Sequence, residues 1–193
     1  MDIFDFSQYS ESFLKIRTKN GRIIPFKPNE PQKRLLSVIE GERKAGRPVR
    51  IIILKARQMG FSTLTEGVLF HSTITSENTT SLVIAHKEEA AAGLFAMNKL
   101  FYDELPERIR PMRNTASTKE MVFENPDKGS AEKGLRSRIR SATAGGRGVG
   151  RSETITNIHA SEVAFWEGDK KAILNGLMQA VPDSPGTMVI LES

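Results

Sequence analysis

The stretch that decides the fold is Val49–Leu69, VRIIILKARQMGFSTLTEGVL. Its start is continuously apolar and β-branched, which predicts a strand, and a loop with the single glycine Gly60 leads into a helical pattern. Strands that are apolar on both faces belong in the middle of parallel sheets, so we expect a central strand at 49–54. A strand, a tight glycine loop and a helix are the frame of a phosphate-binding loop.

This loop departs from the usual pattern G-x-x-x-x-G-K-[ST]. Lys55 stands in place of the first glycine, Phe61 replaces the usual lysine, and Ser62 with Thr63 fills the hydroxyl position. Lysine has a long flexible stem, so Lys55 can reach the same phosphates from the other side of the loop. Ser62 or Thr63 could then offer a hydroxyl to Mg²⁺. The alternative is an ordinary strand-to-helix turn with surface charges.

The prediction is that the whole loop contacts a nucleotide. Its residues are Lys55, Ala56, Arg57, Gln58, Met59, Gly60, Phe61, Ser62 and Thr63. Lys55 and Arg57 are the two cations of the loop and are therefore also candidate catalytic residues.

Composition narrows the class of protein. Among 193 residues there are 28 Lys and Arg against 23 Asp and Glu, a net charge of +5 that suits a polyanionic partner. The absence of cysteine excludes a disulfide scaffold and a thiolate metal site. The apolar runs are far shorter than a membrane span, and residues 1–13 lack the pattern of a signal peptide, so we expect no membrane partner.

Strand and helix patterns alternate along the rest of the chain, which predicts an α/β fold with a mainly parallel sheet flanked by helices. One helix should open with a capping box at Asn29 and Gln32, bury Leu35, Val38 and Ile39, and end near 41–46. Further helices are expected at 62–72, at 88–105 and after the capping residue Asp169. Further strands are expected at 81–86, 121–124, 137–143, 154–159 and 187–191.

A second chemical element follows the strand expected at 154–159, in the sequence ITNIHASEVAFWE at 155–167. In enzymes with a phosphate loop, acidic residues at the tip of a neighbouring strand handle magnesium and polarise the attacking water. Glu162 is the candidate for orienting water, and Ser161, where an aspartate is usual, could hold magnesium only through water. Phe165 and Trp166 are expected in the core. A lone acid after a strand is also a common helix start.

Together these pieces resemble the ATPase domain of phage large terminase subunits, the motors that package DNA into proheads. The matching segments are GRIIPFKPNEPQ at 21–32, ILKARQMGFST at 53–63, GGRGVGRSETITNIHASEVAFW at 145–166 and MVILES at 188–193. The resemblance implies a RecA-like P-loop fold, ATP and Mg²⁺ as cofactors, and ATP hydrolysis that drives translocation of double-stranded DNA.

The resemblance also implies roles for single residues. Gln32 would read the adenine, although it could instead only cap its helix. Arg147 would be a finger that reaches the active site of the next subunit, with Arg151 as the second choice. Glu192 with Ser193 resembles the start of the motif that couples hydrolysis to movement.

Organisation and partners are likewise implied. Residues 1–48 would form an N-terminal arm with the adenine-side helix, and 49–193 an ATPase core that stops before the coupling helix and the nuclease domain. The partners would be double-stranded DNA, the portal protein and the small terminase subunit. The assembled form, in the host cytoplasm, would be a homo-oligomeric ring. The isolated domain could instead be a monomer.

Two other functions stay open on the sequence alone. One is a fragment of a superfamily-2-like helicase or translocase, which shares the core fold. The other is a basic nucleic-acid-binding module without enzymatic activity. Arg136, Arg138 and Arg140 alternate and should share one strand face, which is more often solvated than bound to DNA phosphates.

Overall fold

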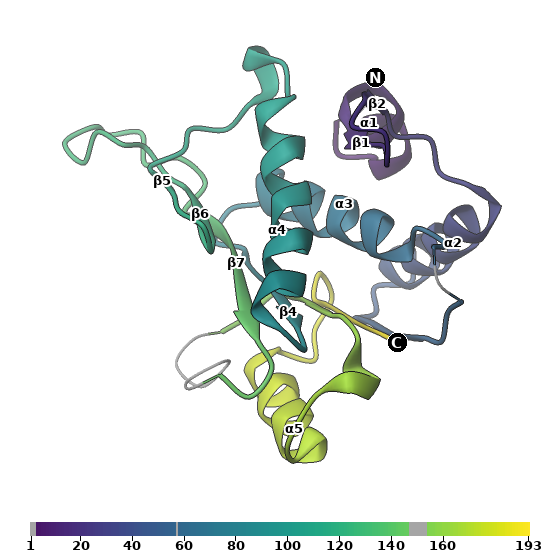
Figure 1. Cartoon of the computed structure of the whole chain (residues 1–193). Coiled ribbons are helices and arrows are strands. Elements are labelled where there is room, and N and C mark those ends of the chain that lie inside the picture. Colours follow the sequence, from purple (N-terminus) through teal and green to yellow (C-terminus); the bar gives the residue numbers. More distant parts are fainter. Residues whose placement is uncertain (1–2, 57, 147–153) are drawn as a thin grey trace.

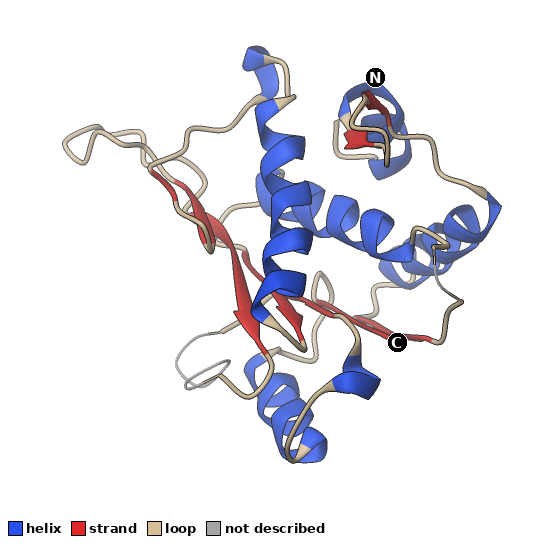
Figure 2. Cartoon of the chain, viewed as in Figure 1, coloured by secondary structure: helices blue, strands red, loops and turns tan. Residues whose placement is uncertain are grey.

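The computed structural model describes residues 3–56, 58–146 and 154–193. They form a mixed α/β fold in which helices cover both faces of one large sheet (Figure 2). The expected α/β architecture with a mainly parallel sheet is therefore confirmed. The helices are α1 (Phe6–Phe13), α2 (Glu30–Lys44), α3 (Phe61–Ile74), α4 (Glu88–Asp103) and α5 (Lys170–Ala180). The strands are β1 (Lys15–Arg17), β2 (Ile23–Pro25), β3 (Val49–Ile53), β4 (Thr80–Ala85), β5 (Thr115–Ala116), β6 (Glu120–Phe123), β7 (Ser137–Thr143), β8 (Asn157–Ala160) and β9 (Met188–Glu192).

The large sheet has the strand order β3-β9-β8-β4-β7-β6-β5, and β1 pairs with β2 in a separate small sheet. Neighbours are parallel from β3 to β7, while β6 and β5 continue the sheet antiparallel. Parallel strands end at the same edge of a sheet, and ligands of such folds bind beyond that edge. The ends of β3, β9 and β8 are therefore neighbours there, with β9 in the middle.

The expectation that the strand before the loop lies in the middle of the sheet is wrong. Within the described residues β3 pairs only with β9, so it forms the edge of the sheet. Ile52 keeps 74% of its surface exposed, and Leu54 just after the strand keeps 87%. An apolar run predicts that both faces are covered, but the run itself carries no information about where in the sheet the strand pairs.

The helices divide between the two faces of the sheet (Figure 1). The side chains of α1 to α4 pack in one apolar cluster, and α5 packs in a second cluster against β4, β8 and β9. Helix α2 begins with the expected capping box of Asn29 and Gln32. Its buried face contains Leu35, Leu36 and Ile39, whereas Val38, expected to be buried, is 52% exposed.

Two smaller expectations also need correction. Phe165 is 62% exposed and lies in a short 3-10 helix, Val163–Phe165, so only Trp166 of the pair belongs to the core. Arg136 precedes β7 at a positive φ of 54°, so it does not share the strand face of Arg138. None of the helices in the described ranges is long and apolar enough to span a bilayer. The division between an arm at 1–48 and a core at 49–193 stays a prediction.

Candidate functional site

The loop between β3 and α3 is held in place by its own glycine and by the start of α2. Gly60 has a φ of 76°, and a side-chain carbon there would lie 2.7 Å from the Gln32 Nε2. Gln32 Nε2 donates to the Gly60 carbonyl at 2.6 Å, and Asn29 Nδ2 donates to the Met59 carbonyl at 3.2 Å. The loop therefore needs glycine at residue 60, because that position combines a left-handed conformation with a close approach.

The side chains of Lys55 and Ser62 meet across the loop between β3 and α3. Lys55 Nζ donates to Ser62 Oγ at 3.1 Å, and Ser62 Oγ donates to Glu192 Oε1 at 2.5 Å. Lys55 Nζ also lies 3.3 Å from the same carboxylate oxygen of Glu192. Thr63, the other candidate hydroxyl, lines a different cavity, so Ser62 is the hydroxyl that faces the lysine.

The end of β8 brings the second predicted element to the same place. Ser161 Oγ donates to Glu192 Oε1 at 2.9 Å, so the hydroxyls of Ser161 and Ser62 converge on one oxygen. Trp166 Nε1 donates to the Ser161 carbonyl at 2.9 Å and fixes the strand tip from the core. Glu162 then turns with a φ of 56°, an unusual conformation for a non-glycine residue that is found more often at functional sites than elsewhere.

A network of buried charges lies beneath these side chains. His159 and Glu66 are both inaccessible to solvent, and the His159 Nδ1 contacts the Glu66 carboxylate. The other carboxylate oxygen of Glu66 accepts a hydrogen bond from Asn98 Nδ2. His159 Nε2 lies 3.2 Å from Glu192 Oε1, with an ion-pair geometry rather than that of a hydrogen bond. The network thus links α3, α4, β8 and β9 to the loop.

The charges of this network shift each other's pKa values. Burial alone would lower the pKa of His159, but the charge of Glu66 and the contact with Glu192 raise it to about 9. Burial alone would raise the pKa of Glu192, but His159, the Ser62 hydroxyl and Lys55 lower it to about 2. At neutral pH Glu192 is therefore a carboxylate and His159 a cation.

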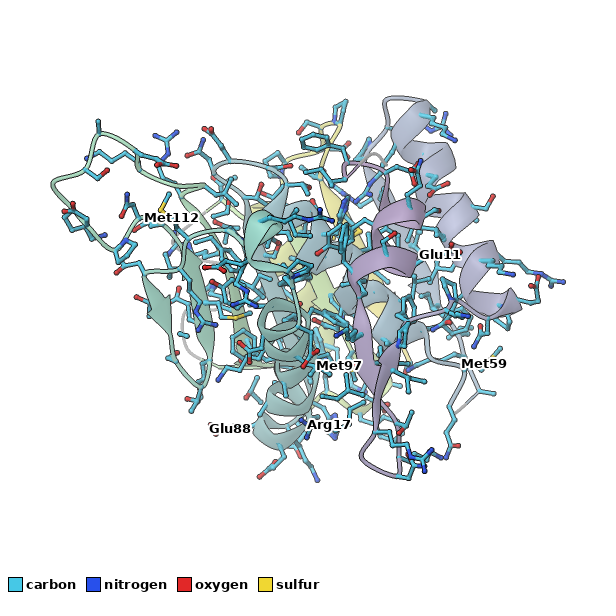
Figure 3. The ribbon with its side chains drawn as sticks, turned by 90° about the horizontal axis from the view of Figure 1, so that it is seen from above. Glu11, Arg17, Met59, Glu88, Met97 and Met112 are labelled. Atoms are coloured by element: carbon cyan, nitrogen blue, oxygen red, sulfur yellow. The ribbon has the colours of Figure 1, made fainter. Side chains whose placement is uncertain are left out.

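A cavity of about 530 Å³ opens beside this constellation. Its walls include Ser62, Ser161 and Glu162 from the carboxyl edge of the sheet, together with Met97 from α4. A second cavity of about 290 Å³ shares Met97 and continues to Arg17 of β1, and Figure 3 labels both residues. Volumes of about 300–1,000 Å³ are typical of small-molecule sites.

The donors at the site are hard oxygen atoms, which fit a magnesium ion. Magnesium in nucleotide sites is usually held by one or two protein oxygens, several waters and the phosphates. Glu192 Oε2 is buried and has no hydrogen-bond partner among the described residues, while Oε1 is fully engaged. No group of three or more His, Cys, Asp or Glu side chains in the described ranges forms a metal centre by itself.

The structure brings together some of the residues predicted to form a site. Lys55, Ser62 and Ser161 converge on Glu192, and Glu162 lines the adjoining cavity. Phe61 packs partly buried against the core. Gln58 in the loop has a φ of 67° and accepts a hydrogen bond from Lys19 Nζ at 2.8 Å. Ala56 is exposed at the start of the loop.

Other predicted residues stand outside this arrangement. The Gln32 side chain caps α2 and holds the loop, so its role toward adenine stays a prediction. Arg57, Arg147 and Arg151 lie outside the described residues.

Sequence reasoning missed three residues of the site. The sequence predicts Glu192 only as part of a coupling motif, and neither His159 nor Glu66 is among the predicted site residues. One signal was available: Glu66 is the only acidic residue of α3, a helix in which most side chains are buried. A carboxylate in such a helix needs a buried partner.

The stretch with the most basic residues lies apart from this site and is largely paired. Arg136 contacts Glu77 at 3.1 Å, and Lys128 contacts Glu124 at 3.1 Å. Arg138 lies 3.9 Å from Glu120. Acidic partners at the surface agree with a solvated basic stretch, which is more common than a stretch that binds DNA phosphates.

Comparison with models of protein families gives no match, and comparison with curated proteins gives none either. Solved structures do match. The crystal structure of the HK97 bacteriophage large terminase superposes with a TM-score of 0.72 at 17% identity, over 97% of this chain and 36% of that one. The Thermus phage P74-26 large terminase ATPase domain gives a TM-score of 0.56 at 15% identity, over 86% of this chain and 70% of that one.

The chain has the fold of a large terminase ATPase domain. A further structure with this fold, the large terminase from a thermophilic bacteriophage in complex with ADP, matches with a TM-score of 0.54 at 9% identity, over 86% of this chain and 38% of that one. Identities this low establish the terminase fold alone. The chain spans 36% of the length of the HK97 large terminase, so activity has to be argued from the site.

Proposed function

We propose that this chain is the ATPase motor domain of a viral large terminase subunit, which hydrolyses ATP to drive double-stranded DNA into a prohead. The observation that carries the proposal is the meeting of Lys55 and Ser62, 3.1 Å apart, in a strand-loop-helix frame at the carboxyl edge of the sheet. A cation and a hydroxyl at the N-terminus of a helix are suited to bind the phosphates of a nucleotide. The terminase fold and the ADP complex of a protein with this fold support the same assignment.

Each residue at the site would have its own role in phosphoryl transfer. Lys55 would bind the terminal phosphates, and the backbone N–H groups at the start of α3 would stabilise their negative charge. Glu162 would orient the water that attacks the γ-phosphorus, from its place on the wall of the cavity. Ser62, and Ser161 through a water, would hold Mg²⁺, which supplies charge neutralisation for the phosphates when it is bound. Gln32 would contact the adenine from the start of α2.

The wider assignment concerns the assembled motor. Arg147, or Arg151, would reach the active site of the next subunit of a homo-oligomeric ring, and the small terminase subunit and portal protein would be further partners in the host cytoplasm. DNA contacts would be made to phosphates, so they should be blind to sequence and weaken with salt. The second half of the motor, with nuclease activity, would lie outside this chain.

The assignment of Lys55 is tested by the substitution Lys55→Ala in the full-length assembled enzyme. ATP turnover should fall by at least about 100-fold, because one electrostatic contact to a developing charge is worth that much or more. Steady-state phosphate release measures the effect. The matched control is Lys171→Ala in α5, an exposed lysine, which should keep normal turnover. Normal turnover in Lys55→Ala would exclude Lys55 as the catalytic cation.

The role of Glu162 is tested by a substitution that should affect hydrolysis but not binding. Glu162→Gln should keep ATP binding and lose hydrolysis, since an amide keeps the shape of the side chain but polarises water poorly. Binding is measured by the nucleotide-dependent rise of the melting temperature, and hydrolysis by phosphate release. Equal loss of binding and hydrolysis would contradict a role confined to the attacking water.

A further inference from the structure

Strand β8 ends at Ala160 and is followed by Ser161 and Glu162, so the first of the two acids usual in this position is missing. The neighbouring strand β9 ends in a buried carboxylate, that of Glu192, which is 1% exposed. The two strands pair in parallel, with Ala160 opposite Leu191, so Ser161 and Glu192 follow at the same level of the sheet. The hydrogen bond of 2.9 Å from Ser161 Oγ to Glu192 Oε1 shows that the carboxylate occupies the space beside the serine.

We propose that Glu192 supplies the magnesium-site carboxylate that β8 lacks, so that the metal acid of this site comes from β9. The inference deepens the proposed function and rests on it. Four side chains converge on Glu192 Oε1: Ser62 at 2.5 Å, Ser161 at 2.9 Å, His159 at 3.2 Å and Lys55 at 3.3 Å. Two of these are the hydroxyls that would hold the metal, and Lys55 is the cation that would bind phosphate.

The second carboxylate oxygen points to an absent partner. Glu192 Oε2 is buried without a hydrogen-bond partner in the described part of the chain. A buried carboxylate oxygen in that state is costly, and it is the kind of hard donor that magnesium or a magnesium-bound water takes. The other oxygen accepts hydrogen bonds from Ser62 and Ser161, and hydrogen bonds of this kind orient metal-binding carboxylates in general.

Two cations neutralise the Glu192 carboxylate. Lys55 Nζ lies 3.1 Å from Ser62 Oγ and 3.3 Å from Glu192 Oε1, and His159 Nε2 lies 3.2 Å from the same carboxylate oxygen. If Lys55 turned toward a phosphate, the buried Glu192 carboxylate would keep only one of its two cationic neighbours, the His159 side chain 3.2 Å away. A magnesium ion bound with the nucleotide would then restore the positive charge that Lys55 had supplied.

The test uses Mn²⁺ as a paramagnetic probe for the metal, with ADP, on the purified chain. Electron paramagnetic resonance measures free Mn²⁺ and hence its affinity for the ADP-loaded protein, and calorimetry measures ADP affinity in EDTA. Glu192→Gln should weaken Mn²⁺ binding by about 10- to 100-fold, the loss typical when a group that tunes a metal site is removed. Its ADP affinity in EDTA should stay within about threefold of the wild-type value. A threefold change corresponds to less than about 0.7 kcal/mol.

A second substitution, Ser161→Asp, places a carboxylate after β8, where an aspartate is usual. In the Glu192→Gln background, Ser161→Asp places a carboxyl carbon near the position of the serine Oγ and should restore most of the lost Mn²⁺ affinity. In the wild-type background the same Ser161→Asp change should raise Mn²⁺ affinity, because two carboxylates then face the metal. The second variant keeps the test decisive even where Glu192→Gln alone folds poorly.

The controls separate this inference from the proposed function. Glu132→Gln removes an exposed carboxylate and should leave Mn²⁺ affinity unchanged. A loss of Mn²⁺ affinity in Glu162→Gln but not in Glu192→Gln would overturn the inference and leave ATP binding in place. Unchanged Mn²⁺ affinity in both Glu192→Gln and Ser161→Asp would also overturn it. A wild-type chain that binds no ADP in EDTA or with Mn²⁺ would overturn the proposed function and this inference together.

Discussion

Charged side chains gather in two regions of this molecule, and the two regions treat charge differently. The buried charge network consists of Lys55, Glu66, His159 and Glu192, and the side chains of the last three are inaccessible to solvent. The basic stretch consists of Lys128, Lys133, Arg136, Arg138 and Arg140, and its ion pairs with Glu124, Glu77 and Glu120 are largely solvated. In the buried network the pKa of His159 is raised to about 9 and the pKa of Glu192 is lowered to about 2.

The difference follows from the medium around the charges. In water an ion pair gains little, because each charge is already solvated and salt screens the attraction. In the protein interior a charge without a partner is costly, so each member of the network depends on the others. Breaking an exposed ion pair of the basic stretch should therefore cost little stability, whereas the network holds β8, β9 and α3 in one arrangement around the candidate site.

The largest expected effect comes from removing one member of the network. Glu66→Ala leaves His159 buried with one carboxylate fewer and Asn98 Nδ2 without its acceptor. The free energy of unfolding should fall by about 3–5 kcal/mol, measured by urea denaturation at pH 7. The matched control is Glu77→Ala, which removes the partner of Arg136 at the surface and should cost less than about 1 kcal/mol. Similar losses in both variants would break the distinction between the two regions.

The pH dependence of stability should sharpen the comparison. The pKa of His159 is raised from 6.5 to about 9, so its stabilisation is fully present below pH 6.5 and is lost as the pH rises through about 9. The pKa of Glu192 is lowered from 4.5 to about 2, so its contribution is present above pH 4.5 and is lost as the pH falls through about 2. Both contributions are therefore complete between pH 4.5 and 6.5.

The variant His159→Gln isolates the alkaline half of this dependence. Between pH 6.5 and 9, the free energy of unfolding of the wild type should fall relative to the variant, with a slope that approaches about 1.4 kcal/mol per pH unit. Urea denaturation at a series of pH values measures both proteins. Parallel curves for the two would show that His159 gains no proton affinity from Glu66 and Glu192.

The smallest effect is expected in the basic stretch. Lys128→Ala removes an exposed ion pair with Glu124, four residues earlier in the sequence. The free energy of unfolding should change by no more than about 0.5 kcal/mol, since such pairs are solvated and screened. Thermal unfolding at low and high salt measures the change. A loss above about 2 kcal/mol would mean that this surface supports the fold in a way its exposure does not indicate.

Much of the local structure could be predicted from the sequence. The capping box of α2, the strand-loop-helix order around Gly60 and the alternation of strands and helices depend on residues close together in the chain, and they are found as expected. The position of β3 at the sheet edge and the exposure of Phe165 were predicted wrongly, because pairing and coverage depend on distant segments.

The sequence by itself determined the displaced lysine of the loop, the serine in its hydroxyl position and the acid that follows β8. Lys55 and Ser62 belong to one strand-loop-helix segment, and Glu162 directly follows Ser161 after β8, so each of the two features depends on residues close together in the chain. Only the tertiary structure decided that Glu192, 130 residues after Ser62, lies between them. The physical reason is the strand order: β9 is inserted between β3 and β8, so the end of the chain's last strand meets the loop of its first parallel strand. The candidate phosphate loop thus depends on residues close together in the chain, whereas the position of the Glu192 carboxylate beside it depends on the strand order of the sheet.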